Sequence, residues 1–458
     1  ESSCTAIDTV AMLKHCTRFS SLVSHVQQLE SKLISAIMAS HRSPQAPVHL
    51  SIPSDLLAAR CPPPHRIHAD LFSHDFKVAD DRAIGVLCRK VLKVDTLAVF
   101  IDGEIGPAAR KVVEFCELVN APFVVGMTGK YWVDETHPLY RGVYGFAGHM
   151  SARDVFTATR VDLILAVGSS LTELATGGWD KLLLNTRLVH IDANAEHFTR
   201  SPMANHHVCS DPALVFERLV AFVKAQLAAG KRWRCCVDPE TPVNILGTRA
   251  SLDAPARCRD VSPPLKPQRL MAALNRMLPP DTHIYVDAGN SWAWMTHYFV
   301  NRNYRGLVHL NTGFGSMGWA VGAAVGAAKA NPQVLTLCIS GDGAYLMSAQ
   351  EISVAAQHAL PVVFLVINDA ALGMVMHGQR LARSEPIGWE LNRVNYAQQA
   401  QSMGVPGVVI QTVEQLEALD FDDFRHMHGP VLLDVRVDRE QVPPIAQRVR
   451  DLGNARKG

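Results

Sequence analysis

The sequence has no excess of charge of either sign. Lys and Arg together number 44, against 43 Asp and Glu, in a chain of 458 residues. Nucleic-acid-binding proteins carry a basic surplus that meets the phosphate backbone, so the balance argues against nucleic acid as a partner. Small anionic ligands would have to be held by local groups.

Long apolar runs and zinc-type cysteine pairs are also missing. Every apolar stretch is interrupted by Gly, Asn or a charged residue well before the roughly 20 residues of a bilayer span, so we expect no membrane partner and no signal peptide. The 10 cysteines are single apart from Cys235-Cys236, and none has C-x-x-C or Cys/His zinc spacing. These features favour a reduced, cytoplasmic setting.

What is present indicates a globular α/β protein of two or three domains. Hydrophobic residues make up 48% of the chain and charged residues 19%, and the length exceeds that of one ordinary core. Short apolar runs that end in Gly or Asp alternate with helical stretches, which predicts parallel sheets. The expected strands lie at 97–101, 123–125, 163–167 and 188–191, and then at 284–286, 307–310, 334–339, 362–367 and 431–435. We predict a first segment at 1–60, a central α/β domain at 80–228, a linker at 229–267 and a last α/β domain at 268–445.

The first segment looks incomplete. Apolar positions with helical spacing fill residues 8–40, and residues 49–52 form a predicted strand that Pro53 closes. One or two helices and one strand are too few to form a sheet of their own. Because the chain begins with Glu1 and not Met, we expect either a processed or truncated chain whose first domain starts upstream, or a naturally short chain.

Two acidic residues follow two neighbouring strands of the last domain. Asp342 lies in the triplet Gly341-Asp342-Gly343 after the run 334–339, and Asp369 follows Asn368 after the run 362–367. The two aspartates are 27 positions apart, enough for a crossover helix between parallel strands. Carboxylates at the same strand edge, where such sheets bind ligands, match the preference of Mg²⁺ for one or two protein carboxylates with phosphate oxygens.

Each motif taken alone also permits a different interpretation. Gly341-Asp342-Gly343 could be only a tight turn, and Asn368-Asp369 only a helix cap. A G-x-G-x-x-G match at residues 313–318 also follows a strand and precedes a small-residue helix, as in NAD-binding dehydrogenases. Asp342 even lies near the expected ribose-binding acid, but that hypothesis leaves Gly341, Gly343 and Asn368-Asp369 unexplained.

Taken together, these residues resemble the thiamine diphosphate-dependent enzymes of the acetolactate synthase, pyruvate oxidase and pyruvate decarboxylase type. The signature is G-D-G, about two dozen residues, and then N-N or N-D, which here runs from Gly341 to Asp369. Residues 350–351, 360–361 and 372–376 (Gln-Glu, Leu-Pro and Leu-Gly-Met-Val-Met) are closest to acetolactate synthase-like members. The resemblance covers nearly the whole chain and implies three α/β domains, of which the pyrimidine-binding one is incomplete here.

The resemblance assigns the cofactor site by position. It implies Mg²⁺ bound by the side chains of Asp342 and Asp369 and by the carbonyl of Ala371. Met317 would wedge beneath the bent thiamine diphosphate, although a core-filling role is the simpler interpretation of that Met alone. The implied cofactor-binding residues are Gly289, Asn290, Ser291, Gly315, Met317, Gly341, Gly343, Ala344, Gly373 and Met374.

The catalytic residue is not assigned. The family uses a glutamate of the pyrimidine domain to activate the cofactor, and we expect it upstream of residue 1. The implied reaction is decarboxylation of a 2-oxo acid and carboligation of the cofactor-bound enamine to an acceptor, a transferase or lyase activity in which the cofactor carries the chemistry. The alternatives are a non-oxidative 2-oxo acid decarboxylase, a cofactor-binding relative without turnover, and a dehydrogenase.

The resemblance also bears on the acceptor, flavin and oligomeric state. Where the synthases have Met-Val-Met-Gln-Trp, this chain has His377-Gly378 in place of Gln-Trp, which predicts a larger acceptor pocket, with His377 either facing it or at the surface. The resemblance leaves FAD open as a further cofactor. The segment Ser169-Ser170-Leu171-Thr172-Glu173, which replaces the Arg-Phe-Asp-Asp-Arg run of the synthases, argues against it. Since family members place the cofactor between two chains, a homodimer or homotetramer is expected.

Overall fold

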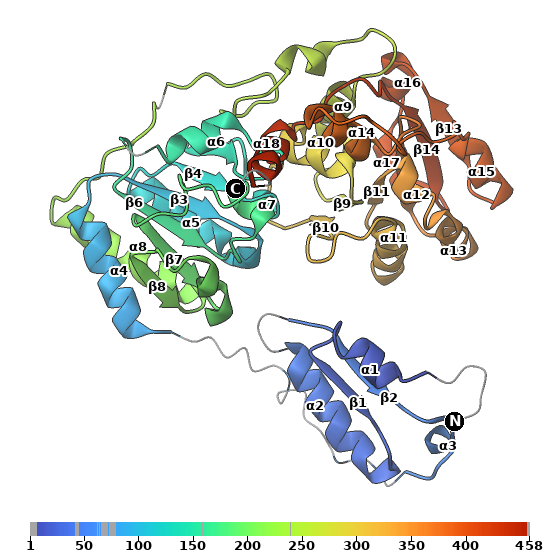
Figure 1. The fold of residues 1–458 in the computed structure, drawn as a ribbon, viewed down its shortest axis with the longest axis horizontal. Helices are drawn as coiled ribbons and strands as arrows, with labels where there is room; N and C mark the ends of the chain where they lie inside the picture. Colours follow the sequence, from blue (N-terminus) through green and yellow to red (C-terminus); the bar gives the residue numbers. More distant parts are fainter. Residues whose placement is uncertain are drawn as a thin grey trace. The chain divides into compact units, whose positions relative to one another are not determined.

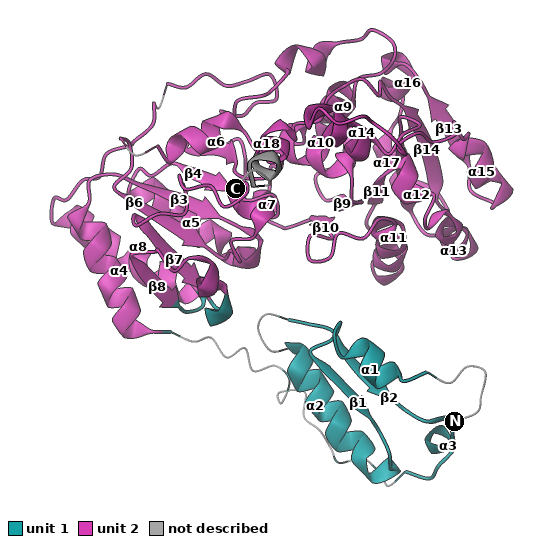
Figure 2. Ribbon diagram, viewed as in Figure 1, with its two compact units in different colours: residues 1–79, 193–196, 209–211 teal, residues 80–192, 197–208, 212–458 magenta. Residues whose placement is uncertain are grey.

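The computed structural model describes residues 7–41, 45–61, 63, 65, 72, 79–157, 159–238 and 240–455, the last five as backbone only. It divides the chain into two compact units (Figure 2). The first is built mainly from residues before 80, with residues 193–196 and 209–211. The second contains the rest of the chain, including nearly all of two six-stranded sheets.

The first unit contains a two-stranded parallel sheet with helices (Figure 1). Its elements are α1 (Thr9–Leu13), β1 (Phe19–Leu22), η1 (Val26–Gln28), α2 (Leu29–His41), β2 (Val48–Ser51) and α3 (Ser54–Leu57). Phe19 of β1 pairs with Val48 of β2. The sequence prediction of helix alone over residues 8–40 is wrong at β1, because pairing with β2 outweighs the helical spacing of the surrounding apolar residues.

The first six-stranded sheet has the strand order β5-β4-β3-β6-β7-β8. The strands are β3 (Leu97–Ile101), β4 (Phe123–Val125), β5 (Tyr140–Val143), β6 (Leu163–Val167), β7 (Leu188–Asp192) and β8 (His206–Cys209). The accompanying helices are α4 (Asp81–Lys93), η3 (Gly103–Ala108), α5 (Ala109–Leu118), η4 (Gly129–Trp132), α6 (Met150–Val155), α7 (Glu173–Thr176), η5 (Ala195–Arg200) and α8 (Pro212–Ala228). The central strands β3 and β6 are fully buried, as apolar strands covered on both faces must be.

The second six-stranded sheet has the order β10-β9-β11-β12-β14-β13. Its strands are β9 (His283–Val286), β10 (Val308–Leu310), β11 (Thr336–Gly341), β12 (Val362–Asn368), β13 (Gly407–Ile410) and β14 (Val431–Arg436). The helices are η6 (Pro255–Arg259), α9 (Pro267–Met277), α10 (Asn290–Tyr298), α11 (Trp319–Ala330), α12 (Asp342–Tyr345), η7 (Ala349–Glu351), α13 (Ile352–Gln357), α14 (Gly373–Leu381), α15 (Tyr396–Ser402), α16 (Val413–Glu417), α17 (Phe421–His426) and α18 (Ala446–Ala455). Because β9 is flanked by β10 on one side and by β11 on the other, the order in which strands are added to the sheet reverses there. Parallel sheets bind ligands at the carboxyl ends of the strands at such a point.

A buried ion pair joins the regions of the two large sheets. Lys130 Nζ lies 3.3 Å from Glu135 Oε2, and both side chains are almost fully buried. The ammonium also donates to the carbonyls of Met295 (3.1 Å) and Phe299 (2.5 Å) at the end of α10, while Asn301 N–H donates to Glu135 at 2.7 Å. These bonds fix η4 against α10.

The helices in the described part of the chain fall short of the combined length and apolar character that a membrane crossing requires.

Candidate functional site

A cavity of about 330 Å³ opens at the carboxyl ends of β9, β11 and β12. Its walls contain every residue for which the sequence suggested a cofactor or metal role. These are Gly289, Asn290, Ser291, Gly315, Met317, Gly341, Asp342, Gly343, Ala344, Asp369, Ala371, Gly373 and Met374. The structure thus brings residues from four separate stretches of the sequence to one place.

Strand register brings the two aspartates together. Gly341 of β11 pairs with Ile367 of parallel β12, so Asp342 and Asp369 both follow the ends of neighbouring strands. Asp342 Oδ1 accepts the N–H of Gly343 at 2.8 Å, and Oδ2 accepts the N–H of Ala370 at 2.7 Å. These two bonds fix the plane of the Asp342 carboxylate while leaving further lone pairs on both oxygens.

Electrostatics at this pair favour a cation. Burial raises the pKa of Asp342 to about 6. Burial and the neighbouring charge of Asp342 raise the pKa of Asp369 to about 8. Two carboxylates that oppose each other's ionisation would both be stabilised in the charged form by a divalent ion.

The backbone directly after Asp369 is held in a strained conformation. Ala370 has φ 54°, in the left-handed region that residues with a Cβ rarely adopt. Its N–H bond to Asp342 accounts for this conformation, since it turns the backbone amide toward the first aspartate. Strain of this kind is typical of functional sites whose surroundings enforce it.

Two glycines keep the space beside the carboxylates open. A Cβ on Gly373 would lie 2.5 Å from Asn290 Nδ2 and 2.7 Å from Asp369 Oδ2. A Cβ on Gly343 would lie 2.6 Å from the Leu372 side chain. The amide oxygen Oδ1 of Asn290 is buried and accepts no hydrogen bond from the described part of the chain. The space that Gly343 and Gly373 leave open would admit a metal-bound diphosphate, and the Asn290 oxygen could accept a hydrogen bond from its bound water.

Helix starts add positive potential to the same wall. Helix α10 begins at Asn290 after Gly289, whose φ of 131° is open only to glycine, and α14 begins at Gly373. Both helices have nine residues. The first N–H groups of a helix favour an anion, so this wall suits a diphosphate next to the metal.

The glycine-rich loop that precedes α11 contributes Gly315 and Met317 to the cavity. Met317 is 37% exposed and its methyl group would lie 3.7 Å from a Cβ on Gly343. Asp287, at the end of β9, accepts N–H bonds from Gly318 (3.0 Å) and Ala320 (3.3 Å) at the start of α11. The amides that a dinucleotide would need are therefore bound to a protein carboxylate, which argues against the dehydrogenase alternative.

The lining residues that were not anticipated from the sequence include Trp292, Asp438 and Arg448. Arg448 of α18 is the one Lys or Arg among the residues that the structure places in the cavity wall, and it forms a two-bond ion pair with Glu173 at 3.0 and 3.3 Å. Asp438 pairs with Lys266 at 3.0 Å. Asp438 and Arg448 carry no local motif because they reach the cavity through tertiary packing, whereas Trp292 directly follows the predicted segment Gly289-Asn290-Ser291.

His377 differs from both interpretations of the sequence. It is 2% exposed, and its Nε2 bonds the carbonyl oxygen of Arg439 at 3.0 Å. It is not among the residues lining the cavity. Burial lowers its pKa, so His377 is a neutral packing residue. Beside it, a Cβ on Gly378 would meet nothing within 4 Å.

Comparison with known proteins places this geometry in a family. Residues 89–219 match the family model "Thiamine pyrophosphate enzyme, central domain", and residues 287–435 match "Thiamine pyrophosphate enzyme, C-terminal TPP binding domain". These two ranges contain most of the strands of the two large sheets and both aspartates.

Curated relatives are similar along most of the chain. The "Putative acetolactate synthase large subunit IlvB2" of Mycobacterium tuberculosis is 29% identical over 451 residues, covering 94% of this chain and 76% of that protein. The acetolactate synthase isozyme 1 large subunit of Escherichia coli is 24% identical over 462 residues, covering 98% of this chain and 78% of that protein.

A solved structure has the same fold. It is described as a "putative thiamin diphosphate-dependent enzyme isolated from Mycobacterium smegmatis", superposes with a TM-score of 0.74 at 20% identity, and covers 94% of this chain and 78% of that one. The two matched domain models, the acetolactate synthase relatives and the shared fold together assign the chain to the thiamine diphosphate-dependent enzymes, with acetolactate synthase-like proteins among its relatives.

Proposed function

We propose that this protein binds thiamine diphosphate through Mg²⁺, decarboxylates a 2-oxo acid and ligates the remaining fragment to an acceptor, as an acetolactate synthase-like carboligase. The observation that carries the proposal is the pair Asp342 and Asp369 at adjacent strand ends. They lie in one cavity wall with every other residue of the predicted cofactor site.

The chain's own groups would divide the work as follows. Asp342, Asp369 and the Ala371 carbonyl would hold Mg²⁺, which in turn would hold the diphosphate. Backbone N–H groups of Gly343 and Ala344, with Asn290 and Ser291 at the start of α10, would meet the phosphate oxygens. When bound, thiamine diphosphate supplies the carbanion and electron-sink chemistry.

The apolar part of the cavity would orient the cofactor. Met317 lies beside Gly343 in the cavity wall, where its side chain would support the bound cofactor. Trp292 is 7% exposed and its Nε1 donates to the carbonyl of Val286 at 3.1 Å, so the ring is a rigid part of the wall. These side chains would exclude water from the reacting end.

The space around Gly378 supports an acceptor different from that of the classical synthases. A Cβ at this position would contact nothing within 4 Å, so a bulkier acceptor would have room beside α14, although Gly378 is not among the residues lining the cavity. A non-oxidative decarboxylase, in which a proton takes the place of the acceptor, is the second candidate. A homodimer or homotetramer in the cytoplasm completes the proposal, in keeping with the family resemblance.

Titration calorimetry of thiamine diphosphate with Mg²⁺ tests the cofactor site. Asp342→Asn and Asp369→Asn should each abolish Mg²⁺-dependent binding, because each removes an anionic ligand. Asp281→Asn is the matched control, since Asp281 pairs with Arg425 in the same domain and is absent from the cavity lining. Unchanged affinity in either ligand variant would refute the metal assignment.

A panel of 2-oxo acids tests the reaction. Release of CO₂ together with a condensed product, seen with full-length protein and lost in Asp369→Asn, would support the carboligase. CO₂ release with an aldehyde product would support the decarboxylase instead. Cofactor binding without CO₂ from any donor would contradict both activities.

A further inference from the structure

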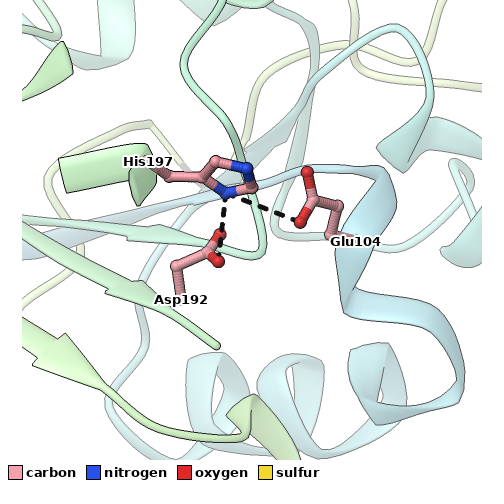
Figure 3. A group of neighbouring side chains, drawn as sticks. All are labelled: Glu104, Asp192 and His197. Atoms are coloured by element: carbon pink, nitrogen blue, oxygen red, sulfur yellow. Dashed lines mark ion pairs between the residues drawn. The ribbon is translucent and has the colours of Figure 1, made fainter. Parts of the chain in front are cut away.

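A second group of metal-ligating side chains lies at the carboxyl edge of the first six-stranded sheet. Glu104 lies in η3 directly after β3, Asp192 ends β7, and His197 lies in η5. In Figure 3 the three side chains converge on one point. His197 Nδ1 lies 3.1 Å from Asp192 Oδ1 and 3.6 Å from Glu104 Oε2. The ligand atoms of the three residues all lie within 4.8 Å of one another.

These distances suit a shared ion. Imidazole nitrogen and carboxylate oxygen bind Zn²⁺ at about 2.0 to 2.2 Å, so two adjacent ligands in a tetrahedral site lie about 3 to 3.5 Å apart. The separations from His197 Nδ1 are of this size. One imidazole nitrogen with two carboxylates is a donor set that selects a divalent transition ion over Mg²⁺ or Ca²⁺, which prefer oxygen alone.

Two buried carboxylates lie close to Glu104. Asp192 is 1% exposed and Asp102, at the end of β3, is 7% exposed. Asp192, Asp102, His197 and Arg200 are all close enough to Glu104 to interact with it electrostatically. The guanidinium of Arg200 donates to the carbonyl of Ser170 at 2.8 Å.

Asp102 itself is not a candidate ligand. Its carboxylate accepts hydrogen bonds from Thr128 Oγ1 (2.7 Å), Ser169 Oγ (2.8 Å) and Gly103 N–H (2.8 Å). These bonds fix Asp102 in the sheet edge. Its charge therefore adds to the negative potential around Glu104 without supplying a free ligand atom.

The same acids make the adjoining cavity unsuitable for a flavin diphosphate. This cavity has a volume of about 580 Å³ and opens at the ends of β3 and β6. Asp102 and Glu104 lie in its wall, and the described residues that line it include no Lys or Arg. A diphosphate there would meet carboxylates without a cation to offset them, so these residues do not fit FAD.

We propose that Glu104, Asp192 and His197 bind a divalent transition-metal ion, at a site separate from the Mg²⁺ site of the last domain. The ion balances the buried carboxylates at this sheet edge. Glu104, whose side chain is 43% exposed, faces solvent and gives the ion its route of entry. Water fills the remaining coordination positions.

Co²⁺ is the probe, because its visible absorption reports the ligands directly. Full-length protein is stripped with chelator and titrated with Co²⁺ in the absence of thiamine diphosphate and Mg²⁺. We expect one equivalent to bind with visible bands typical of nitrogen and oxygen ligands. Glu104→Gln should weaken Co²⁺ binding at least about 10-fold. Loss of a residue that only hydrogen-bonds to a metal ligand typically lowers metal affinity about 10- to 100-fold, and loss of a ligand itself should cost no less. His197→Gln should remove the bands.

Two control variants separate this site from other causes. Glu117→Gln makes the same change at an exposed acid that also contacts a histidine, His137, at 3.1 Å, and should leave Co²⁺ affinity unchanged. Asp369→Asn should also leave it unchanged while abolishing Mg²⁺-dependent cofactor binding. Because Glu104 is partly exposed, Glu104→Gln should fold even if His197→Gln does not. Absence of Co²⁺ binding, equal affinity in Glu104→Gln, or loss of binding in Asp369→Asn would overturn the proposal.

Discussion

Replacing Gly373 with Ala tests the geometry of the predicted Mg²⁺ site, because the substitution adds a methyl group and leaves the charge of the site unchanged. The added Cβ would lie 2.7 Å from Asp369 Oδ2 and 2.5 Å from Asn290 Nδ2, whereas ordinary contact begins at 3.4 Å. The carboxylate oxygen must therefore retreat by about 0.7 Å and the amide nitrogen by about 0.9 Å. Mg²⁺ holds its ligands at about 2.0 to 2.1 Å in a near-ideal octahedron, so a displacement of this size breaks the bond to Asp369.

We expect the affinity for thiamine diphosphate with Mg²⁺ to fall about 100-fold, or about 2.7 kcal/mol, comparable to the effect of a 1 Å misplacement in an active site. The fold should survive, because Gly373 begins α14 without a positive φ and Ala favours helix. The matched control is Gly378→Ala in the same helix, whose Cβ meets nothing within 4 Å. Calorimetric titration gives the affinities, and thermal unfolding of the metal-free protein gives stability. Wild-type affinity in Gly373→Ala, or an equal loss in Gly378→Ala, would refute this reasoning.

Three more predictions concern the pKa of Asp369, the buried pair Lys130–Glu135 and the open position Gly378. Since the folded pKa of Asp369 is about 8 against an ordinary 3.8, the unfolded state binds fewer protons over that range. Stability of the metal-free protein should therefore fall as pH rises between these values, and thermal melts of Asp369→Asn should show a flatter dependence; an identical slope would contradict the shift. Lys130→Met should lower the free energy of unfolding by about 3 to 5 kcal/mol, because Glu135 is left buried and unpaired; denaturant titration should show part of the loss recovered in the double variant with Glu135→Gln, and full additivity would argue against the pair. Gly378→Trp should fold, because the position is open, and should reduce ligation to bulky acceptors in product assays while leaving CO₂ release intact; unchanged product ratios would place the acceptor elsewhere.

The fold could be predicted from the sequence wherever strands are buried on both faces. Residues 97–101 and 163–167 were expected as strands and are β3 and β6 with the same bounds. The edge strands β5, β8 and β13 were missed, because Tyr140-Arg141-Gly142-Val143, His206-His207-Val208-Cys209 and Gly407-Val408-Val409-Ile410 lack a long apolar run. An edge strand is defined by the partner it pairs with, and single-sequence patterns carry little information about partners.

The predicted part of the site comes from residues next to strand ends. Asp342 and Asp369 could be placed together because parallel register brings successive strand ends to one edge. Arg448 could not, since it reaches the cavity from α18 through its ion pair with Glu173 in the other sheet's region. Nor did spacing reveal the convergence of Glu104, Asp192 and His197, which depends on where β3 and β7 end in the folded sheet.

Asp287 explains why a nucleotide-type glycine pattern can occur in a protein that uses the loop differently. The N-terminus of a helix favours a negative charge. Glycines are needed where the backbone before the helix must come close to that charge. Here the attracted charge belongs to the polypeptide itself, through the bonds to Gly318 and Ala320. These two N–H groups are thereby bound within the protein, and Met317 of the same loop lines the cavity. A sequence motif identifies the glycine-rich turn before a helix. Whether that turn binds a ligand or only supports the fold depends on which anion accepts hydrogen bonds from its N–H groups.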